Sequence, residues 1–229
     1  MARSFAKNAA ARSADRRCHV PGSEPATIRR QVHNGRKGGI YYGPVRGFRA
    51  PAGSVAAQLG RHMRIEQEIA AWDGKSAVDI KSIYDVFSSE TNFADSIIAL
   101  SFTQACEKGA TWLLKAWLEA GNALDQAQVA KIYGSLDQLE HWEAKLHVLQ
   151  SIPFMSIAEA DSSNLYNFLK LSLTDQNKFV RAWSYNGFYE LSMQHSIYLN
   201  ETKQYIEMAM RDETPSVKAR IRNIMKKGL

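Results

Sequence analysis

A short frame recurs three times in the second half of the chain, and each copy begins with an aspartate. The aspartates are Asp137, Asp175 and Asp212, so the copies start 38 and 37 residues apart. That interval is typical of proteins built from stacked pairs of helices. Each aspartate follows a polar turn and precedes an apolar pattern of helical period, so it predicts where the second helix of a repeat begins. The copies read Asp137-x4-Trp142-Glu143-Ala144, Asp175-x4-Val180-Arg181-Ala182 and Asp212-x4-Val217-Lys218-Ala219.

From Met63 onwards the sequence predicts nine or ten helices joined by short polar links. Helix-start signals mark several of them, among them Ser76 followed by Asp79, the lone Asp125, and Thr214 before a proline. No stretch alternates apolar and polar residues over the length of a strand. These patterns predict an all-α fold.

The frame resembles the HEAT-repeat pattern, in which the second helix carries Asp, then Val and Arg five and six residues on, then small residues. Residues 175–184 match best, and Lys218 stands at the Arg position of the third copy. The first copy departs from the pattern, because Trp142 replaces Val and Glu143 replaces Arg. The resemblance covers about residues 90–229 and implies a right-handed α-solenoid of HEAT/armadillo-like helical pairs.

The resemblance also implies contacts between repeats. In HEAT-like repeats the arginine ties the aspartate to a neighbouring repeat, so a ladder of Asp175 with Arg181 and of Asp212 with Lys218 is expected. Glu143 cannot donate a hydrogen bond, so we expect the ladder to be broken or rerouted at the first copy.

One stripe of the helix that follows Asp175 is expected to pack closely against a neighbour. Val180, Ser184, Gly187 and Leu191 share this stripe, and two of the four are small. A glycine inside a helix costs about 1 kcal/mol relative to alanine. We therefore expect close helix packing to offset that cost at Gly187.

Residues 1–62 differ in character from the rest of the chain. They hold 12 Lys and Arg against two carboxylates, whereas residues 63–229 hold 17 against 21. Prolines and glycines interrupt every helical or strand pattern, so we expect a disordered basic tail preceding a helical repeat domain over 63–229. Three interpretations of the tail stay open: an inert or non-native segment with translation starting at Met63, an organelle transit peptide, and an RNA-binding arm.

Aligning the copies by their aspartates gives a shared row of side chains on the second helices. The row holds Arg181, Tyr185 and Tyr189 in the second copy, and Lys218 and Arg222 in the third. We predict that these five contact a partner, because exposed Tyr and Arg anchor interfaces and the cations suit an acidic or phosphorylated segment. In the alternative, the tyrosines pack between repeats and the cations cover an end helix.

The sequence predicts no catalytic residue, no cofactor site and no metal site. His141 and His147 are six residues apart and fall on different faces of a helix, and Cys106 lies on an apolar helix. Whether the protein is an enzyme stays open, although the residues favour a non-enzymatic protein. One enzyme class with such a scaffold is the helical-repeat alkylpurine DNA glycosylases, in which Trp and Tyr walls and a carboxylate meet a damaged nucleotide. The segment Arg181-Ala182-Trp183-Ser184-Tyr185 resembles them.

The predicted function is that of a scaffold or adaptor that binds a protein or peptide through the face lined by second helices. The alternative is a DNA- or RNA-binding helical-repeat protein. If the tail is an RNA-binding arm, nucleic acid is expected to contact the N-terminal tail alone. Two cysteines make no disulfide framework, and no apolar run approaches the ~20 residues that span a bilayer. A cytoplasmic location without a membrane segment is expected, or an organelle if the tail is a transit peptide. The oligomeric state is not predicted.

Overall fold

The structure is a computed structural model that describes residues 55–228, and for residues 55–58 and 61 it describes the backbone alone. Predictions made for residues 1–54 lie outside the described residues. The described part contains ten α-helices and three short 3₁₀ helices without a strand, which confirms the predicted all-α fold. No helix among these residues is long and apolar enough to cross a membrane. The α-helices are α1 Val55–Ala71, α2 Ala77–Phe87, α3 Phe93–Leu100, α4 Glu107–Glu119, α5 Gln126–Tyr133, α6 Trp142–Ser151, α7 Glu159–Ser172, α8 Lys178–Gln194, α9 Leu199–Asp212 and α10 Pro215–Met225, and the 3₁₀ helices are η1 Leu136–Gln138, η2 Ile152–Phe154 and η3 Ser196–Tyr198.

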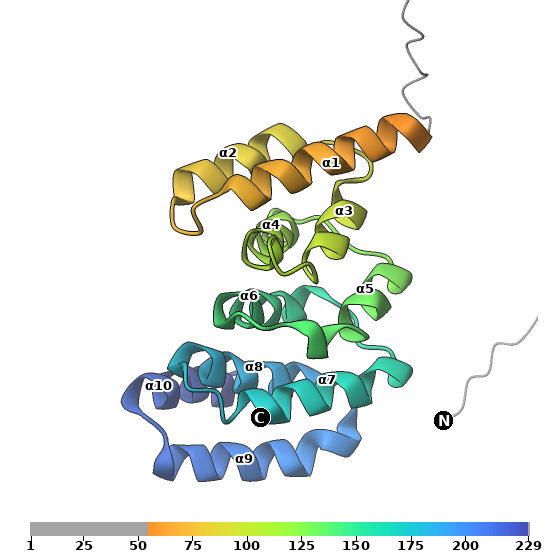
Figure 1. Cartoon of the computed structure of the whole chain (residues 1–229). Helices are drawn as coiled ribbons and strands as arrows, with labels where there is room; N and C mark the ends of the chain where they lie inside the picture. Colours follow the sequence, from red (N-terminus) through yellow and green to blue (C-terminus); the bar gives the residue numbers. More distant parts are fainter. Residues whose placement is uncertain (1–54, 229) are drawn as a thin grey trace, which may run out of the picture. The chain divides into compact units, whose positions relative to one another are not determined.

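The described helices form two rows that lie side by side (Figure 1). In one row α1 packs on α3, α3 on α5 and α5 on α7; in the other, α2, α4, α6, α8 and α10 pack on one another in that order. Contacts of α1 with α2, α3 with α4, and α7 with α8 join the rows, while α9 packs on α8 and α10. The apolar core therefore lies between the rows and between successive layers.

Helix α1 begins before the boundary that the sequence suggested. It starts at Val55, eight residues ahead of Met63, so part of the predicted tail is helical. No proline lies between these two positions, and the last proline before the helix is Pro51. A helix can therefore extend backwards from the amphipathic segment to this point.

The first copy of the repeat frame is shifted by two residues relative to the alignment made from the sequence. Helix α6 begins at Trp142, which is 41% exposed, whereas Ala144, Val180 and Val217 are each fully buried at the third position of their helices. Asp137 lies in η1 and does not begin α6. On either side of Asp137, Leu136 and Leu139 bury apolar side chains, so this segment packs into the core before α6 starts.

The expected close packing at Gly187 is confirmed. A Cβ atom placed there would overlap Cδ2 of Leu169 on α7 and lie 3.2 Å from Cδ1 of Ile152 in η2. Ser151 is the equivalent residue of α6 in the corrected register, and it is small and fully buried as well. A small residue at this position therefore lets a neighbouring element approach in two successive layers.

Gly187→Leu is expected to lower the free energy of unfolding by about 1–3 kcal/mol, because the added side chain has no space beside Leu169. The loss is measured by urea denaturation followed by circular dichroism. Met193→Leu, at an exposed position of the same helix, serves as the control and should leave stability unchanged. An unchanged midpoint for Gly187→Leu would show that the helix contact adapts without strain.

Candidate functional site

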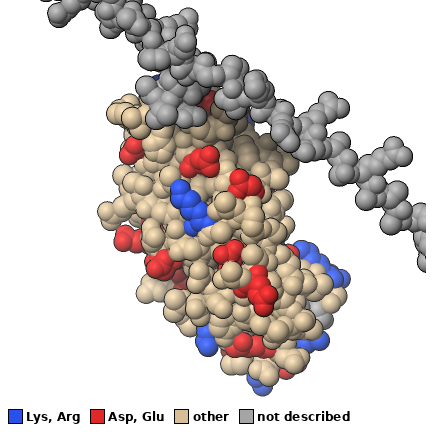
Figure 2. Space-filling model, turned by 90° about the vertical axis from the view of Figure 1, so that its right-hand side faces the viewer, with Lys and Arg blue, Asp and Glu red and all other residues tan. Residues whose placement is uncertain are grey.

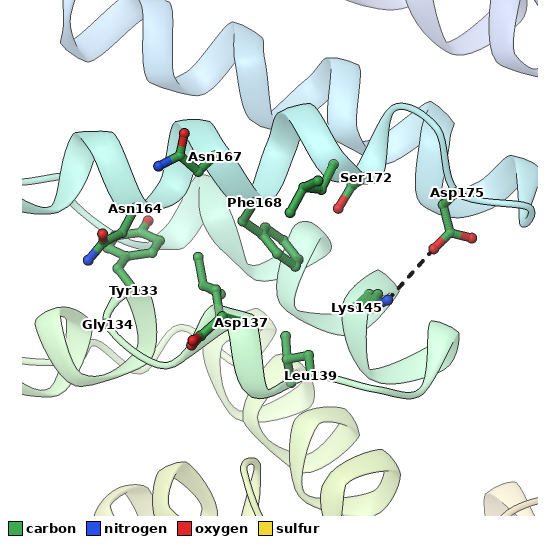
Figure 3. Close-up of a pocket in the computed structure, with 12 residues that line it drawn as sticks. Tyr133, Gly134, Asp137, Leu139, Lys145, Asn164, Asn167, Phe168, Ser172 and Asp175 are labelled. Carbon is green, nitrogen blue, oxygen red and sulfur yellow. Dashed lines mark ion pairs between the residues drawn. The ribbon is translucent and has the colours of Figure 1, made fainter.

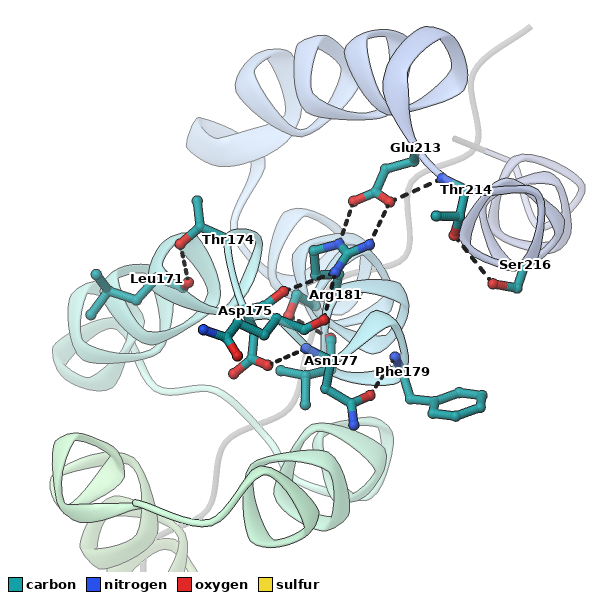
Figure 4. Close-up of polar contacts among 12 residues, drawn as sticks. Leu171, Thr174, Asp175, Asn177, Phe179, Arg181, Glu213, Thr214 and Ser216 are labelled. Atoms are coloured by element: carbon teal, nitrogen blue, oxygen red, sulfur yellow. Dashed lines mark hydrogen bonds and ion pairs between the residues drawn. The ribbon is translucent and has the colours of Figure 1, made fainter.

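Arg181 is engaged in a structural contact. Its Nε and Nη2 atoms donate to the Glu213 carboxylate at 2.8 and 3.1 Å (Figure 4). Its Nη1 atom donates to the backbone carbonyls of Asp175 and Gln176 at 2.9 and 3.2 Å. The hydrogen bonds that Arg181 donates to Glu213 raise the pKa of Arg181 above its ordinary value. The guanidinium therefore joins the start of α8 to the turn between α9 and α10.

Tyr185 and Tyr189 are buried, with 6% and 8% of their surfaces exposed. They belong to an apolar cluster with Val217 and Ile221 of α10, so the interpretation that places them on an accessible face is wrong and the packing alternative holds. The corrected register gives the reason, because Tyr185 takes the position of the fully buried Leu149 of α6. Burial raises the pKa of Tyr185 to about 12.

The two predicted contact residues on α10 differ in their surroundings. Lys218 is half-buried, and its Nζ atom donates to the carbonyl of Arg211 at 2.8 Å. Arg222 is exposed to solvent. The five predicted contact residues therefore do not form one accessible row, although Arg222 remains available.

A ladder of ion pairs joins successive even-numbered helices, by a route that differs from the predicted one. Lys108 of α4 pairs with Glu143 of α6 at 2.8 Å, which is the rerouting expected at the first copy. The later rungs are Lys145 with Asp175 at 3.9 Å and Arg181 with Glu213 at 2.8 Å. The predicted pairing of the Asp175 and Asp212 carboxylates with Arg181 and Lys218 is corrected, because both cations reach carbonyls or other acids instead.

A cavity of about 340 Å³ opens between the end of α5, η1, α6 and α7 (Figure 3). Helix α7 supplies one wall from residues spaced three and four apart, which share a face: Asn164, Asn167, Phe168 and Leu171. The opposite wall comes from η1 and its flanks. Two amides therefore stand beside an aromatic and an aliphatic side chain at the rim of one cavity.

The Lys145–Asp175 ion pair closes one end of the cavity (Figure 3). The Asp175 side chain also accepts the N–H of Asn177 at 2.7 Å, which fixes the turn between α7 and α8. The two charges at this end are thus balanced and held in place. The remaining protons of the Lys145 ammonium and lone pairs of the Asp175 carboxylate can still form hydrogen bonds with a ligand.

Tyr133, the last residue of α5, lines the same cavity and carries a buried hydroxyl without a hydrogen-bond partner among the described residues. The side chain is 1% exposed. Burial raises the pKa of Tyr133 above its ordinary value, and the nearby Asp161 and Glu190 act in the same direction. The phenol therefore stays protonated and is a donor that lies beside Asn164 in Figure 3.

Apolar side chains are exposed around the turn that follows the cavity. Leu171 on the rim is 74% exposed, and Trp142 and Phe179 are 41% and 50% exposed. Trp142 shares a second hollow with Asp175 and Asn177, and this hollow adjoins the cavity at Asp175. We call the two hollows together the α7–α8 groove, whose residues are Tyr133, Gly134, Leu136, Asp137, Leu139, Trp142, Lys145, Asn164, Asn167, Phe168, Leu171, Ser172, Asp175, Gln176 and Asn177.

Sequence reasoning missed this groove. Asn164 and Asn167 read as the ordinary solvated face of an amphipathic helix. The one available signal was Leu171, an apolar residue whose side chain is exposed on that face.

The residues that suggested metal or DNA-glycosylase chemistry have other surroundings. The described residues contain no cluster of three or more His, Cys, Asp or Glu side chains able to hold a metal ion. His147 lies 3.2 Å from the Thr111 hydroxyl, and Trp183 is covered by the guanidinium of Arg220 at 3.8 Å. Tyr185 is buried, so its ring cannot form a wall of an accessible base pocket together with Trp183.

Comparison of the chain with protein-family models, curated proteins and solved structures gave no match.

Proposed function

We propose that the protein is a non-enzymatic helical-repeat scaffold, a right-handed HEAT-like α-solenoid, that binds an extended segment of a partner protein in the α7–α8 groove. The two rows of helices with similar layers support the repeat architecture. The groove supports the binding role, because it combines apolar surface with a few fixed polar groups.

The observation that carries the proposal is the pairing of amides with exposed apolar side chains along one wall. Asn164 and Asn167 can each donate to and accept from the main chain of an extended peptide. Leu171 and Trp142 offer apolar anchors on either side of Asp175. An extended peptide requires both kinds of contact, since its amide groups must stay hydrogen-bonded when water is displaced.

The charge of the described surface favours a protein partner over nucleic acid. Figure 2 shows Asp and Glu scattered over the side of the odd-numbered helices, with Lys and Arg gathered mainly toward the end where α9 and α10 lie. Residues 63–210 hold 11 Lys and Arg against 19 carboxylates. A nucleic-acid surface would spread its cations along several layers.

The test begins with a library of random 12-residue peptides displayed on phage and selected against the full chain. Peptides selected in this way are expected to bind with micromolar affinity, and Leu171→Asp should weaken them at least tenfold. Val78→Asp is the matched control, because Val78 is equally exposed, at 74%, on the distant helix α2. A selection without binders, or binders unaffected by Leu171→Asp in a protein with unchanged melting temperature, would contradict the proposal.

A further inference from the structure

A third hollow, of about 270 Å³, lies between the first turns of α8 and the middle of α10. It is next to the α7–α8 groove in sequence, because Asn177 lines that groove and the two following residues, Lys178 and Phe179, line the hollow. No carboxylate lines it, although the described part of the chain is acidic elsewhere. The residues used below are Lys178, Phe179, Trp183, Ser216, Arg220 and Asn223.

Arg220 is a cation held in position without an acidic partner. Its Cζ atom lies 3.8 Å from the centre of the Trp183 ring, so the guanidinium stacks on the indole face. It forms no hydrogen bond or ion pair with any described residue, in contrast to Arg181, whose donors reach Glu213 and two carbonyls. The contact with the ring holds the guanidinium over the indole and leaves its N–H groups without an acceptor among the described residues.

The neighbouring polar groups are a second cation and neutral hydrogen-bond donors. Lys178 is exposed, and its Nζ atom lies 5.4 Å from the centre of the Phe179 ring. Ser216 and Asn223 add a hydroxyl and an amide that can donate hydrogen bonds. Burial, with no acid to offset it, lowers the pKa of Arg220. A ligand that brings negative charge would therefore restore the interactions that burial removes from this guanidinium.

We propose that the Arg220–Trp183 hollow binds an oxyanion, a carboxylate or a phosphate carried by an acidic segment of a protein partner. The planar guanidinium matches two oxygens of either group, and Lys178 supplies a second charge. Nucleic acid is the less favoured source, because it would need phosphate contacts along several layers. The inference rests on the proposed function in one respect: Lys178 of the hollow directly follows Asn177 of the α7–α8 groove in the chain, and we therefore place the acidic residue on the segment bound in that groove.

The test titrates the full chain with inorganic phosphate and with acetate at constant ionic strength, using ¹⁵N-labelled protein. The readout is the indole N–H resonance of Trp183, assigned by Trp183→Phe. We expect a saturable shift with a millimolar dissociation constant for phosphate and a weaker one for acetate. Arg220→Gln should weaken phosphate binding at least tenfold, and Arg220→Lys should weaken it less, because it keeps the charge but loses the planar pair of donors.

Arg222→Gln is the matched control, because Arg222 lies on the same helix, two residues away and exposed. It should leave the phosphate titration unchanged. A shift that does not saturate, or that is equal in the Arg220 and Arg222 variants, would show a general ionic effect and overturn the site. Arg220-dependent binding of a DNA oligonucleotide that is tighter than binding of a phosphopeptide would overturn the choice of partner.

The outcomes separate this site from the proposed function. Saturable phosphate binding at Trp183 without Leu171-dependent peptide binding would retain the oxyanion site and remove the peptide groove. Binding of acidic peptides that depends on Leu171 but not on Arg220 would retain the groove and overturn the assignment of the oxyanion to the segment bound there.

Discussion

Glu107→Leu is expected to lower the free energy of unfolding by about 2–4 kcal/mol, because it removes the acceptor for two backbone donors. The Glu107 side chain is 2% exposed, and its Oε1 atom accepts the N–H groups of Glu140 and His141 at 2.7 and 3.1 Å. These donors directly precede α6, where no N-cap side chain supplies an acceptor. One carboxylate on α4 thus caps the helix of the next layer, where it also meets the positive end of the helix dipole.

Two further variants separate the cross-layer cap from a general effect of removing charge. Glu107→Gln keeps one acceptor oxygen and should cost about 1 kcal/mol. Glu119→Leu removes an exposed carboxylate at the end of the same helix, where it pairs with Lys115, and should change stability by no more than about 0.5 kcal/mol. Urea denaturation at neutral pH measures all three. A loss for Glu107→Leu as small as that for Glu119→Leu would exclude the capping role.

The helices and their buried stripes could be predicted because they depend on local patterns. Val180, Ser184, Gly187 and Leu191 were assigned to one stripe from their spacing, and the structure buries all four. Thr214 and Pro215 were predicted to start the last helix, and α10 begins at Pro215. A helix start or a helical spacing of apolar residues can be recognised in the sequence without knowing which element packs against the helix.

The register of the first repeat could not be predicted from the frame. Trp142 resembled Val180 in its distance from an aspartate, but the link before α6 holds a 3₁₀ turn and shifts the helix start. This error in the register of α6 also affected the predicted contact row, because it aligned Glu143 with Arg181. The residue in that row is Lys145, and like Arg181 it pairs with an acid in the turn before the next even-numbered helix.

The groove depends on residues far apart in sequence. Tyr133, Asn164 and Lys145 come from three helices, and each alone has an ordinary explanation as a core or surface residue. Tyr185 shows the converse case, because an aromatic residue on a polar-looking face became buried when the next layer covered it. Contacts between layers decide both outcomes, and a single repeat does not contain them.

The protein is expected to lose stability between about pH 7 and pH 5 through His147. Burial lowers the pKa of His147 to about 4, and the charges of Lys115 and Lys108 act in the same direction. The charge of Glu143 and a hydrogen bond with the backbone of Lys108 oppose them. In an unfolded chain the pKa of histidine is about 6.5. Between these two values the unfolded chain binds a proton that the folded protein excludes, so stability falls as the pH falls. The loss through this residue should reach about 1–2 kcal/mol at pH 5.

His147→Gln isolates this contribution, because glutamine keeps hydrogen-bonding groups near the Thr111 hydroxyl and does not titrate. The free energy of unfolding of both proteins is measured by urea denaturation at about pH 7.5, 6 and 5. The stability of the wild type relative to the variant should decrease by about 1–2 kcal/mol across this range. Parallel profiles would show that His147 binds its proton equally well in the folded and unfolded chains. Acidic groups such as Glu213, whose pKa is lowered by the hydrogen bond from Arg181, titrate in both proteins and cancel in the difference.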